Sequence, residues 1–201
     1  MTTTPTPGRR TSGGPVLQDD VTQAIESAFF AELADVGYGR LSIDAVAKRA
    51  AVGKAAVYRR WRSKLDMAMA LVSKVAVAAI DVPDTGTLRG DIRQYLYNGR
   101  DALSHPLARR IVPDMLAESI RNPDLAEVLA RTVRDPRRVK AAELFERAVD
   151  RGELPPDADL ELSADLLAGA LYWRLAVLQL AVDDDYCDRL ADRIVAAVTS
   201  V

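Results

Sequence analysis

The chain has 201 residues, of which 49% are hydrophobic and 28% charged, and its formal net charge is −2; these values are typical of a globular protein. One cysteine (Cys187) and one histidine (His105) exclude an internal disulfide and a structural zinc site, which needs about four nitrogen or sulfur ligands. No segment has the apolar core of a secretory signal or the roughly 18 apolar residues that span a bilayer. We therefore expect a cytoplasmic protein without a metal or cofactor.

The first part of the chain predicts short helices after a disordered tail. Residues 1–18 are rich in Thr, Pro and Gly and are expected to be disordered. Apolar residues from Val21 to Val36 recur every three or four positions, which predicts a helix that ends at Gly37. Two short helices are expected next, over 43–50 and 53–61, and a longer one over 64–81.

Helix-breaking residues divide the rest of the chain. Helices are expected over 87–104, from Pro106, from Pro123, from the Asp135-Pro136 region to Gly152, over 159–182 and over 185–200. Asp135-Pro136 either interrupts a helix or starts the next one. Because no stretch alternates as a strand does, we predict an all-α fold of about nine helices. We divide it into a tail (1–18), a helix-turn-helix head (19–65) and a body (66–201).

Positive charge is concentrated in one short segment. Residues 1–65 hold ten Lys/Arg against six Asp/Glu, whereas residues 66–201 hold 17 against 23. Residues 51–64, AVGKAAVYRRWRSK, carry five basic side chains and no acidic one. A basic head on an acidic body indicates that the head alone meets an anionic partner.

Residues 43–61 have the spacing of a helix-turn-helix, whose second helix lies in the major groove of DNA. Val57 and Trp61 are four residues apart and are expected to face inward. The opposite face carries Lys54, Ala55, Tyr58, Arg59 and Arg62. Basic side chains can donate to guanine, the alanine methyl can touch thymine, and the tyrosine hydroxyl can donate to a phosphate. A basic run is more often a solvated face, but its place on such a helix pair favours DNA binding.

Residues 41–64, LSIDAVAKRAAVGKAAVYRRWRSK, resemble the DNA-binding head of TetR-family transcriptional regulators, and the match covers about residues 20–70. The resemblance implies an all-helical homodimer with a ligand-responsive body. Its motif positions imply DNA contacts by Lys54, Ala55, Tyr58, Arg59 and Arg60, and phosphate contacts by Ser42 and Lys64.

Three positions depart from the pattern of that family, which often has Gly where Ala51 stands, Ser at Gly53 and a phosphate-binding Thr at Ala56. We expect these differences to alter affinity or operator preference and to leave the fold intact. In the tail, Arg9 and Arg10 have two interpretations: minor-groove contacts beside the site, or incidental charge on a disordered segment.

The predicted helix over 159–182 is apolar on nearly all sides and must be buried on two of them. One side is expected to meet the core of the body. The other, with the last helix, is expected to meet a second copy of the chain across a twofold axis. We assign this interface to Leu167, Ala170, Leu171, Leu178, Leu190 and Ile194. The alternative is an ordinary central core helix.

A ligand pocket in the body is predicted from apolar and amphipathic positions, which favour a moderately hydrophobic ligand. The candidates are Tyr95, Leu103, Ile111, Met115, Leu129 and Trp173. Residues of these types are more often ordinary core. His105 is expected to cap a helix or lie on the surface, and Cys187 is expected to be a packing residue, with redox sensing as the alternative.

These features predict a homodimeric repressor, not an enzyme, bound to a palindromic site on double-stranded DNA. A dimer would hold two recognition helices about 34–36 Å apart, and a small-molecule effector would release the DNA by favouring another spacing. The alternative is a ligand-independent DNA-binding or architectural protein with the same head. An enzyme or carrier is disfavoured because His and Cys are scarce and no glycine-rich phosphate loop is present.

Overall fold

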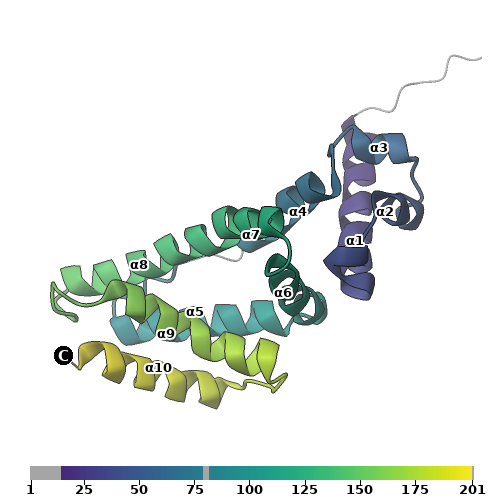
Figure 1. The fold of residues 1–201 in the computed structure, drawn as a ribbon. Helices are drawn as coiled ribbons and strands as arrows, with labels where there is room; N and C mark the ends of the chain where they lie inside the picture. The colour runs from purple at the N-terminus through teal and green to yellow at the C-terminus, as the bar shows by residue number, and fades with distance from the viewer. Residues whose placement is uncertain (1–14, 79–81, 201) are drawn as a thin grey trace, which may run out of the picture.

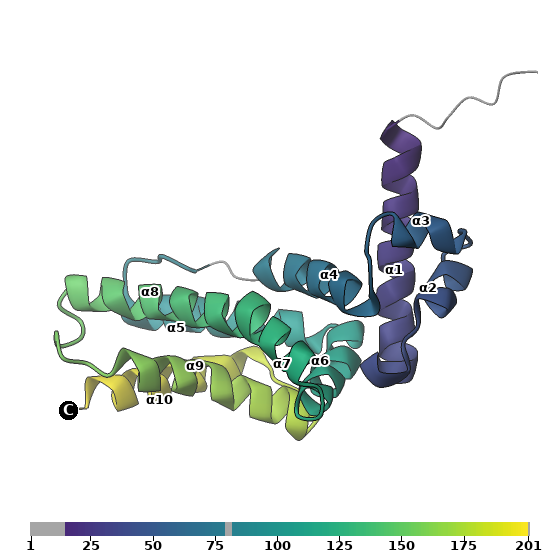
Figure 2. The same cartoon turned by 45° about the horizontal axis from the view of Figure 1, so that its top comes forward.

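The computed structural model describes residues 15–78 and 82–200, and within these ranges the chain is helical and contains no strand. This confirms the predicted all-α class. Three helices form a head at one end of the molecule, while α5, α8, α9 and α10 lie side by side at the other end (Figures 1 and 2). Arg9, Arg10 and most of the predicted tail lie outside the described residues.

The head consists of α1 (Pro15–Arg40), α2 (Ile43–Arg49) and α3 (Lys54–Tyr58), and α4 (Lys64–Ala78) follows it. Two boundaries differ from the prediction. α1 begins at Pro15, inside the segment expected to be disordered, and α3 ends at Tyr58 instead of near Trp61. After Tyr58 the chain continues as a turn, in which the amides of Arg60 and Trp61 both donate to the Val57 carbonyl.

The body contains α5 (Leu88–Ser104), α6 (Pro106–Ser119), α7 (Pro123–Leu129), α8 (Asp135–Asp150), α9 (Leu160–Tyr172) and α10 (Asp184–Thr199), with two π-helical turns, η1 (Ala130–Arg134) and η2 (Trp173–Val177). η1 joins α7 to α8 in one continuous helix. Since Pro136 has no N–H to donate to the preceding turn, a local change of helical pitch is expected before it. Asp135-Pro136 therefore neither ends nor restarts the helix.

The prediction of one helix over 159–182 was too long. Helical structure ends with η2 at Val177, and Gln179 adopts a left-handed conformation with φ of 56°. At the start of α6, the expectation for His105 is confirmed, since its Nδ1 accepts a hydrogen bond from the Leu107 amide at 3.3 Å.

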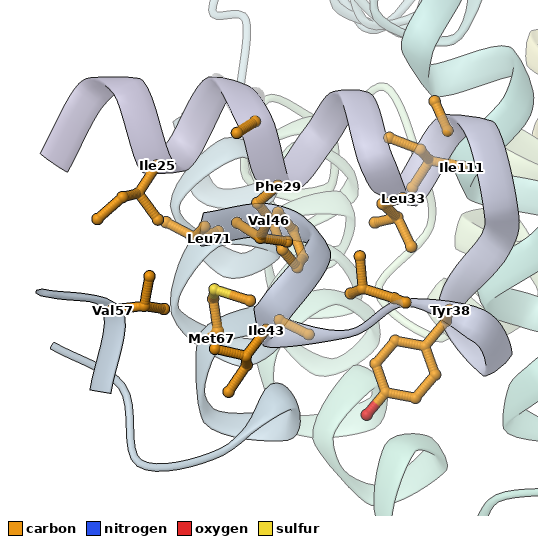
Figure 3. Packing of buried hydrophobic residues seen from close by; sticks show 14 of the residues in the cluster. Ile25, Phe29, Leu33, Tyr38, Ile43, Val46, Val57, Met67, Leu71 and Ile111 are labelled. Atoms are coloured by element: carbon orange, nitrogen blue, oxygen red, sulfur yellow. The ribbon is translucent and has the colours of Figure 1, made fainter. Parts of the chain in front are cut away.

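Two apolar clusters hold the fold together. The first joins α1, α2, α3 and α4, and its members Phe29, Val46 and Val57 are fully buried (Figure 3). It extends to Ile111 of α6, so the core of the head passes beyond residue 65 into the body. The second cluster lies among α5, α8, α9 and α10 and is centred on large buried side chains such as Phe145.

The end of α1 is the junction between head and body. The helix kinks at Gly37 (φ 77°, ψ 164°). The amide of Tyr38 donates to the Asp114 carboxylate of α6 at 2.7 Å. From α4, Lys64 Nζ donates to the Tyr38 and Gly39 carbonyls at 2.9 and 3.3 Å and lies 4.5 Å from the Tyr38 ring centroid. The free carbonyls at the end of a helix favour a cation in this position.

Replacing Gly37 by alanine should destabilise the protein. A left-handed backbone costs an L-residue roughly 1–2 kcal/mol, and the added Cβ would lie 2.4 Å from Asp114 Oδ1. We expect Gly37→Ala to lower the free energy of unfolding in urea by about 2 kcal/mol. The matched control is Gly39→Ala, whose Cβ would meet only Glu118 at an ordinary 3.5 Å. Equal stability of the two variants would contradict this account of the junction.

Candidate DNA-binding site

The helix-turn-helix is held against α1 by apolar side chains. Val46 of α2 and Val57 of α3 are both fully buried in the cluster around Phe29 (Figure 3). Trp61 is partly buried against the same cluster, as predicted. In the turn between the helices, Ala51 has a left-handed φ of 55°, a conformation that costs alanine about 1 kcal/mol or more.

The outward side of α3 and the following turn forms a surface that we call the recognition face: Lys54, Ala55, Tyr58, Arg59 and Arg62. All five are exposed, including half of Tyr58 and 61% of the Lys54 side chain. The face therefore presents three cations, one methyl group and one phenol to solvent. These groups match the acceptors of guanine, the thymine methyl and the phosphate oxygens of a major groove.

Two residues assigned to DNA by motif position have partners inside the protein. Arg60 is half-buried, and its guanidinium donates to Thr22 Oγ1 of α1 at 2.8 Å and to the Ala56 carbonyl at 2.9 Å. Lys64 is half-buried on the α1 carbonyls described above. The structure therefore gives both residues a role in holding helices together, which their position in the sequence motif did not indicate.

Ser42 combines a structural contact with exposure. Its hydroxyl accepts a hydrogen bond from the Ala45 amide at 3.2 Å and caps α2. Since the hydroxyl can still donate its own proton, the predicted phosphate contact remains compatible with this geometry.

Asp44 and Lys48 of α2 were missed by the sequence analysis. Asp44 forms an ion pair with Lys54, with Asp44 Oδ2 2.5 Å from Lys54 Nζ, so an acidic group lies at the edge of the recognition face. Lys48 is exposed one helical turn further along α2, on the side of Asp44. The four-residue spacing of Asp44 and Lys48 was visible in the sequence, but their approach to α3 depends on how the two helices pack.

A charged network links the recognition unit to α6. Arg49 of α2 bonds to Glu32 and Asp35 of α1 at 2.9 and 2.7 Å, and Arg110 of α6 lies 3.3 Å from Asp35. The hydrogen bond from Arg49 is the main reason that the pKa of Asp35 is lowered. Exposed ion pairs contribute little stability, so the network acts mainly by aligning three helices.

The six residues predicted to line one pocket are not brought together. Ile111, Met115 and Leu129 belong to the cluster of the head, whereas Tyr95 and Leu103 pack against the cluster of the body. Trp173 is 57% exposed on the outer side of η2, so its assignment to a pocket was wrong. Two hollows found on the described surface lie elsewhere, one on α10 and one between α1 and Arg59-Arg60.

The predicted dimer residues need a similar correction. Leu167, Leu171 and Ile194 are at most 4% exposed and lie within the body's own core. Ala170 and Leu190 are half-buried, and only Leu178 is exposed, at 45%. The apolar residues that α9 and η2 turn outward are Leu162, Leu166, Trp173 and Val177. The sequence showed a helix that is apolar all round, but which side meets the chain's own core depends on packing.

The last candidates from the sequence are Cys187, a metal site and a membrane-spanning helix. Cys187 is fully buried, and burial raises the pKa of its thiol, so the residue lacks the thiolate character of a redox sensor. Among the described residues, no group of three His, Cys, Asp or Glu is placed to hold a metal ion. None of the helices in the described ranges is both long and apolar enough to cross a membrane.

Comparison with known proteins decides the family. The family model described as "Bacterial regulatory proteins, tetR family" matches residues 27–71, and that described as "Tetracyclin repressor-like, C-terminal domain" matches residues 82–194. The chain belongs to the TetR family. It is thus a DNA-binding transcriptional regulator and not an enzyme, as the sequence predicted.

Individual TetR-family proteins resemble most of the chain. An uncharacterised regulator of Bacillus subtilis, YdeS, is 31% identical over 167 residues, which cover 82% of each protein. A DNA-binding transcriptional repressor of Mycobacteroides abscessus is 31% identical over 159 residues, 79% of this chain and 83% of the relative. The structure of Bacillus subtilis FadR in complex with stearoyl-CoA has a TM-score of 0.68 over 89% of this chain and 98% of FadR. At 15% identity, FadR shows the shared fold alone.

Arg59→Ala should reduce sequence discrimination without unfolding the head, because the Arg59 side chain is exposed. Loss of a base contact costs about 1–3 kcal/mol. We expect a gel shift to show a roughly tenfold or greater loss on the operator and a smaller loss on scrambled DNA. Arg131→Ala removes the same charge from an exposed site in the body and should leave both affinities unchanged. Equal losses on both DNAs would overturn a base-reading role for Arg59.

Asp44→Asn should strengthen DNA binding, because it removes a carboxylate that neutralises Lys54 at the edge of the recognition face. We expect an affinity gain of about threefold or more at low salt that diminishes as salt rises. The gain is measured by fluorescence anisotropy on labelled duplex DNA. Asp157→Asn changes the net charge equally at an exposed loop of the body and should have no effect. A loss of affinity in Asp44→Asn would mean that the ion pair orders Lys54 for DNA.

Proposed function

We propose that this TetR-family regulator is a cytoplasmic, homodimeric repressor that binds a palindromic operator and is released from it by a small, moderately hydrophobic ligand. The recognition face carries the proposal, because its cations project from a helix that is locked to α1 by Val57 and Arg60. Because α3 is held rigidly, several hydrogen-bond donors can enter one major groove of DNA together. The repressor from Mycobacteroides abscessus supports the sign of regulation.

The outer side of α9 and η2 supports a homodimer. Leu162, Leu166, Trp173 and Val177 are spaced by four, seven and four residues and are 40–57% exposed, so they form an apolar stripe. A Cβ built on Gly169, between Leu166 and Trp173, would meet nothing within 4 Å, which leaves room for a second backbone. Apolar patches of this kind mark protein interfaces. Two copies of the chain that pack through this stripe would be related by a twofold axis, and the dimer would then carry two recognition faces.

Contacts of α6 support control of the head by the body. This helix binds the end of α1 through Asp114 and Arg110, and it also packs against α5 and η2 of the body. A ligand that prefers a different position of α6 would therefore shift the head by its differential affinity. FadR, which shares the fold, is described in complex with stearoyl-CoA and supports a ligand with an apolar part.

A ligand-independent DNA-binding protein is the second candidate. Ile111 and Met115, which were predicted to line a pocket, are instead packed in the core of the head, at 8% and 4% exposure. Gel shifts on DNA flanking the regulator's own gene, repeated at two salt concentrations, test the proposal. An amphipathic compound that abolishes the shifted band supports the repressor. A band that no compound changes supports the second candidate.

Leu166→Glu should produce a monomer, because a charge would be placed in the centre of the apolar stripe. Burying an unpaired carboxylate costs several kcal/mol, so we expect analytical ultracentrifugation to show a monomer and gel shifts to show loss of operator binding. Val139→Glu is the matched control, since Val139 is 60% exposed on α8, outside the stripe; it should remain dimeric. A dimeric Leu166→Glu protein would rule out this stripe as the interface.

A further inference from the structure

One partly buried arginine of the body makes no hydrogen bond or ion pair with another described residue. Among the described residues from 82 onward, every arginine except Arg137 and Arg193 makes a hydrogen bond or ion pair with another described group. Arg193 is exposed on α10, where water solvates it. Arg137 is only partly exposed, and its Nε is fully buried without a hydrogen-bond acceptor. A buried polar group of this kind calls for an explanation.

Arg137 lies on the inner side of α8. It precedes buried Ala141 by one helical turn, and Leu144 and Phe145 continue the same buried face. Helix α5 packs against this face. The Nε of Arg137 therefore lies on the inner side of the helix, where a hydrogen-bond donor without an acceptor is costly.

Tyr95 of α5 is a partly buried polar residue on a helix that packs against α8. It follows buried Ile92 by one turn, and it packs against the cluster of the body. Burial raises the pKa of its phenol, and the charge of Arg137 opposes that rise; the helices that carry the two residues, α5 and α8, pack together. The Tyr95 hydroxyl makes no hydrogen bond with any described residue. The guanidinium can only donate and the phenol can also donate, and the Nε of Arg137 has no acceptor among the described residues.

Two other partly buried arginines of the body, Arg151 and Arg147, find partners within the chain. Arg151 is matched by the carboxylates of Asp91 and Glu153 at 3.0 and 2.6 Å. Arg147 also has an Nε without an acceptor, but its Nη2 donates to the Pro83 carbonyl at 2.5 Å. Arg137 has neither a carboxylate nor a carbonyl partner among the described residues. It also follows the π-helical turn η1 by three residues, and such turns occur often at functional sites.

We propose that Arg137 and Tyr95 bind the anionic group of the effector, a carboxylate or a phosphate, between α5 and α8. The inference rests on the proposed function, since it assumes that a small molecule binds the body, and it narrows the ligand to an amphipathic acid. The guanidinium supplies a two-pronged pair of donors and the phenol adds a third. The apolar part of the ligand would lie against the cluster of the body.

The experiment compares three probes with the same ten-carbon chain: decanoate, decyl phosphate and decanol. Binding to the full-length protein is measured by isothermal titration calorimetry. We expect at least one acid to bind more tightly than decanol, and the tighter of the two acids identifies carboxylate or phosphate as the group recognised. Charge-assisted hydrogen bonds are strong, so Arg137→Met should weaken acid binding about ten- to hundredfold. The binding of decanol should not change.

Arg131→Met is the control, because Arg131 is exposed and its single ion pair, with Glu127, is long at 3.5 Å. It removes the same charge from the same region and should change acid binding less than about threefold. Tyr95→Phe should weaken acid binding by a smaller factor than Arg137→Met, and it tests the site independently if Arg137→Met fails to fold. Without ligand, Arg137→Met should unfold at the same or a higher temperature than the native protein, because it removes a buried donor that has no acceptor.

Three results would overturn the inference: no measurable binding of either acid, equal binding of acids and decanol, or equal losses in Arg137→Met and Arg131→Met. Operator binding by the ligand-free native protein is measured in parallel. If it is intact while the acids do not bind, only the anion site fails. If the ligand-free protein shows no sequence-specific DNA binding, the proposed function itself fails.

Discussion

The segment Gly37–Gly39 at the end of α1 is the constraint on which the geometry of the molecule depends. Asp114 of α6 accepts a hydrogen bond from the Tyr38 amide. Lys64 of α4 donates to the carbonyls of Tyr38 and Gly39. The left-handed Gly37 lets α6 approach closely enough for the first of these bonds. Because α1 also carries Phe29, against which α2 and α3 pack, the position of the recognition face follows from how this junction is held.

Neighbouring residues of the recognition segment divide their roles between stability and DNA binding. Val57 and Arg60 point back to α1, while Tyr58 and Arg59 are exposed. The 100° step between successive helical residues separates Val57 from Tyr58, and the turn after α3 separates Arg59 from Arg60. The same segment can therefore be rigid on one side and solvent-exposed on the other. Asp44 adds an opposing charge at the edge, which limits how strongly the head attracts any DNA.

Two arginines of the body differ in their hydrogen-bond partners. Around Arg151, three carboxylates and a buried network stabilise the fold without any ligand. Around Arg137, the buried Nε donor has no acceptor within the described chain. A protein that leaves a cation in this state gives up some stability, which is the usual consequence of building a binding site.

The sequence by itself determined the helical class, the helix-turn-helix and the exposed recognition face, because these depend on local periodicity, capping and a short-range motif. Lys54, Tyr58 and Arg59 are exposed, as the periodicity predicted. Tertiary structure alone decided which side of a wholly apolar helix is free: Leu167 faces the core and Leu166 faces outward, although they are adjacent. It likewise decided the partners of Lys64 and Arg137, because a long charged side chain takes its role from whatever distant helix packs beside it, and no local pattern encodes that neighbour.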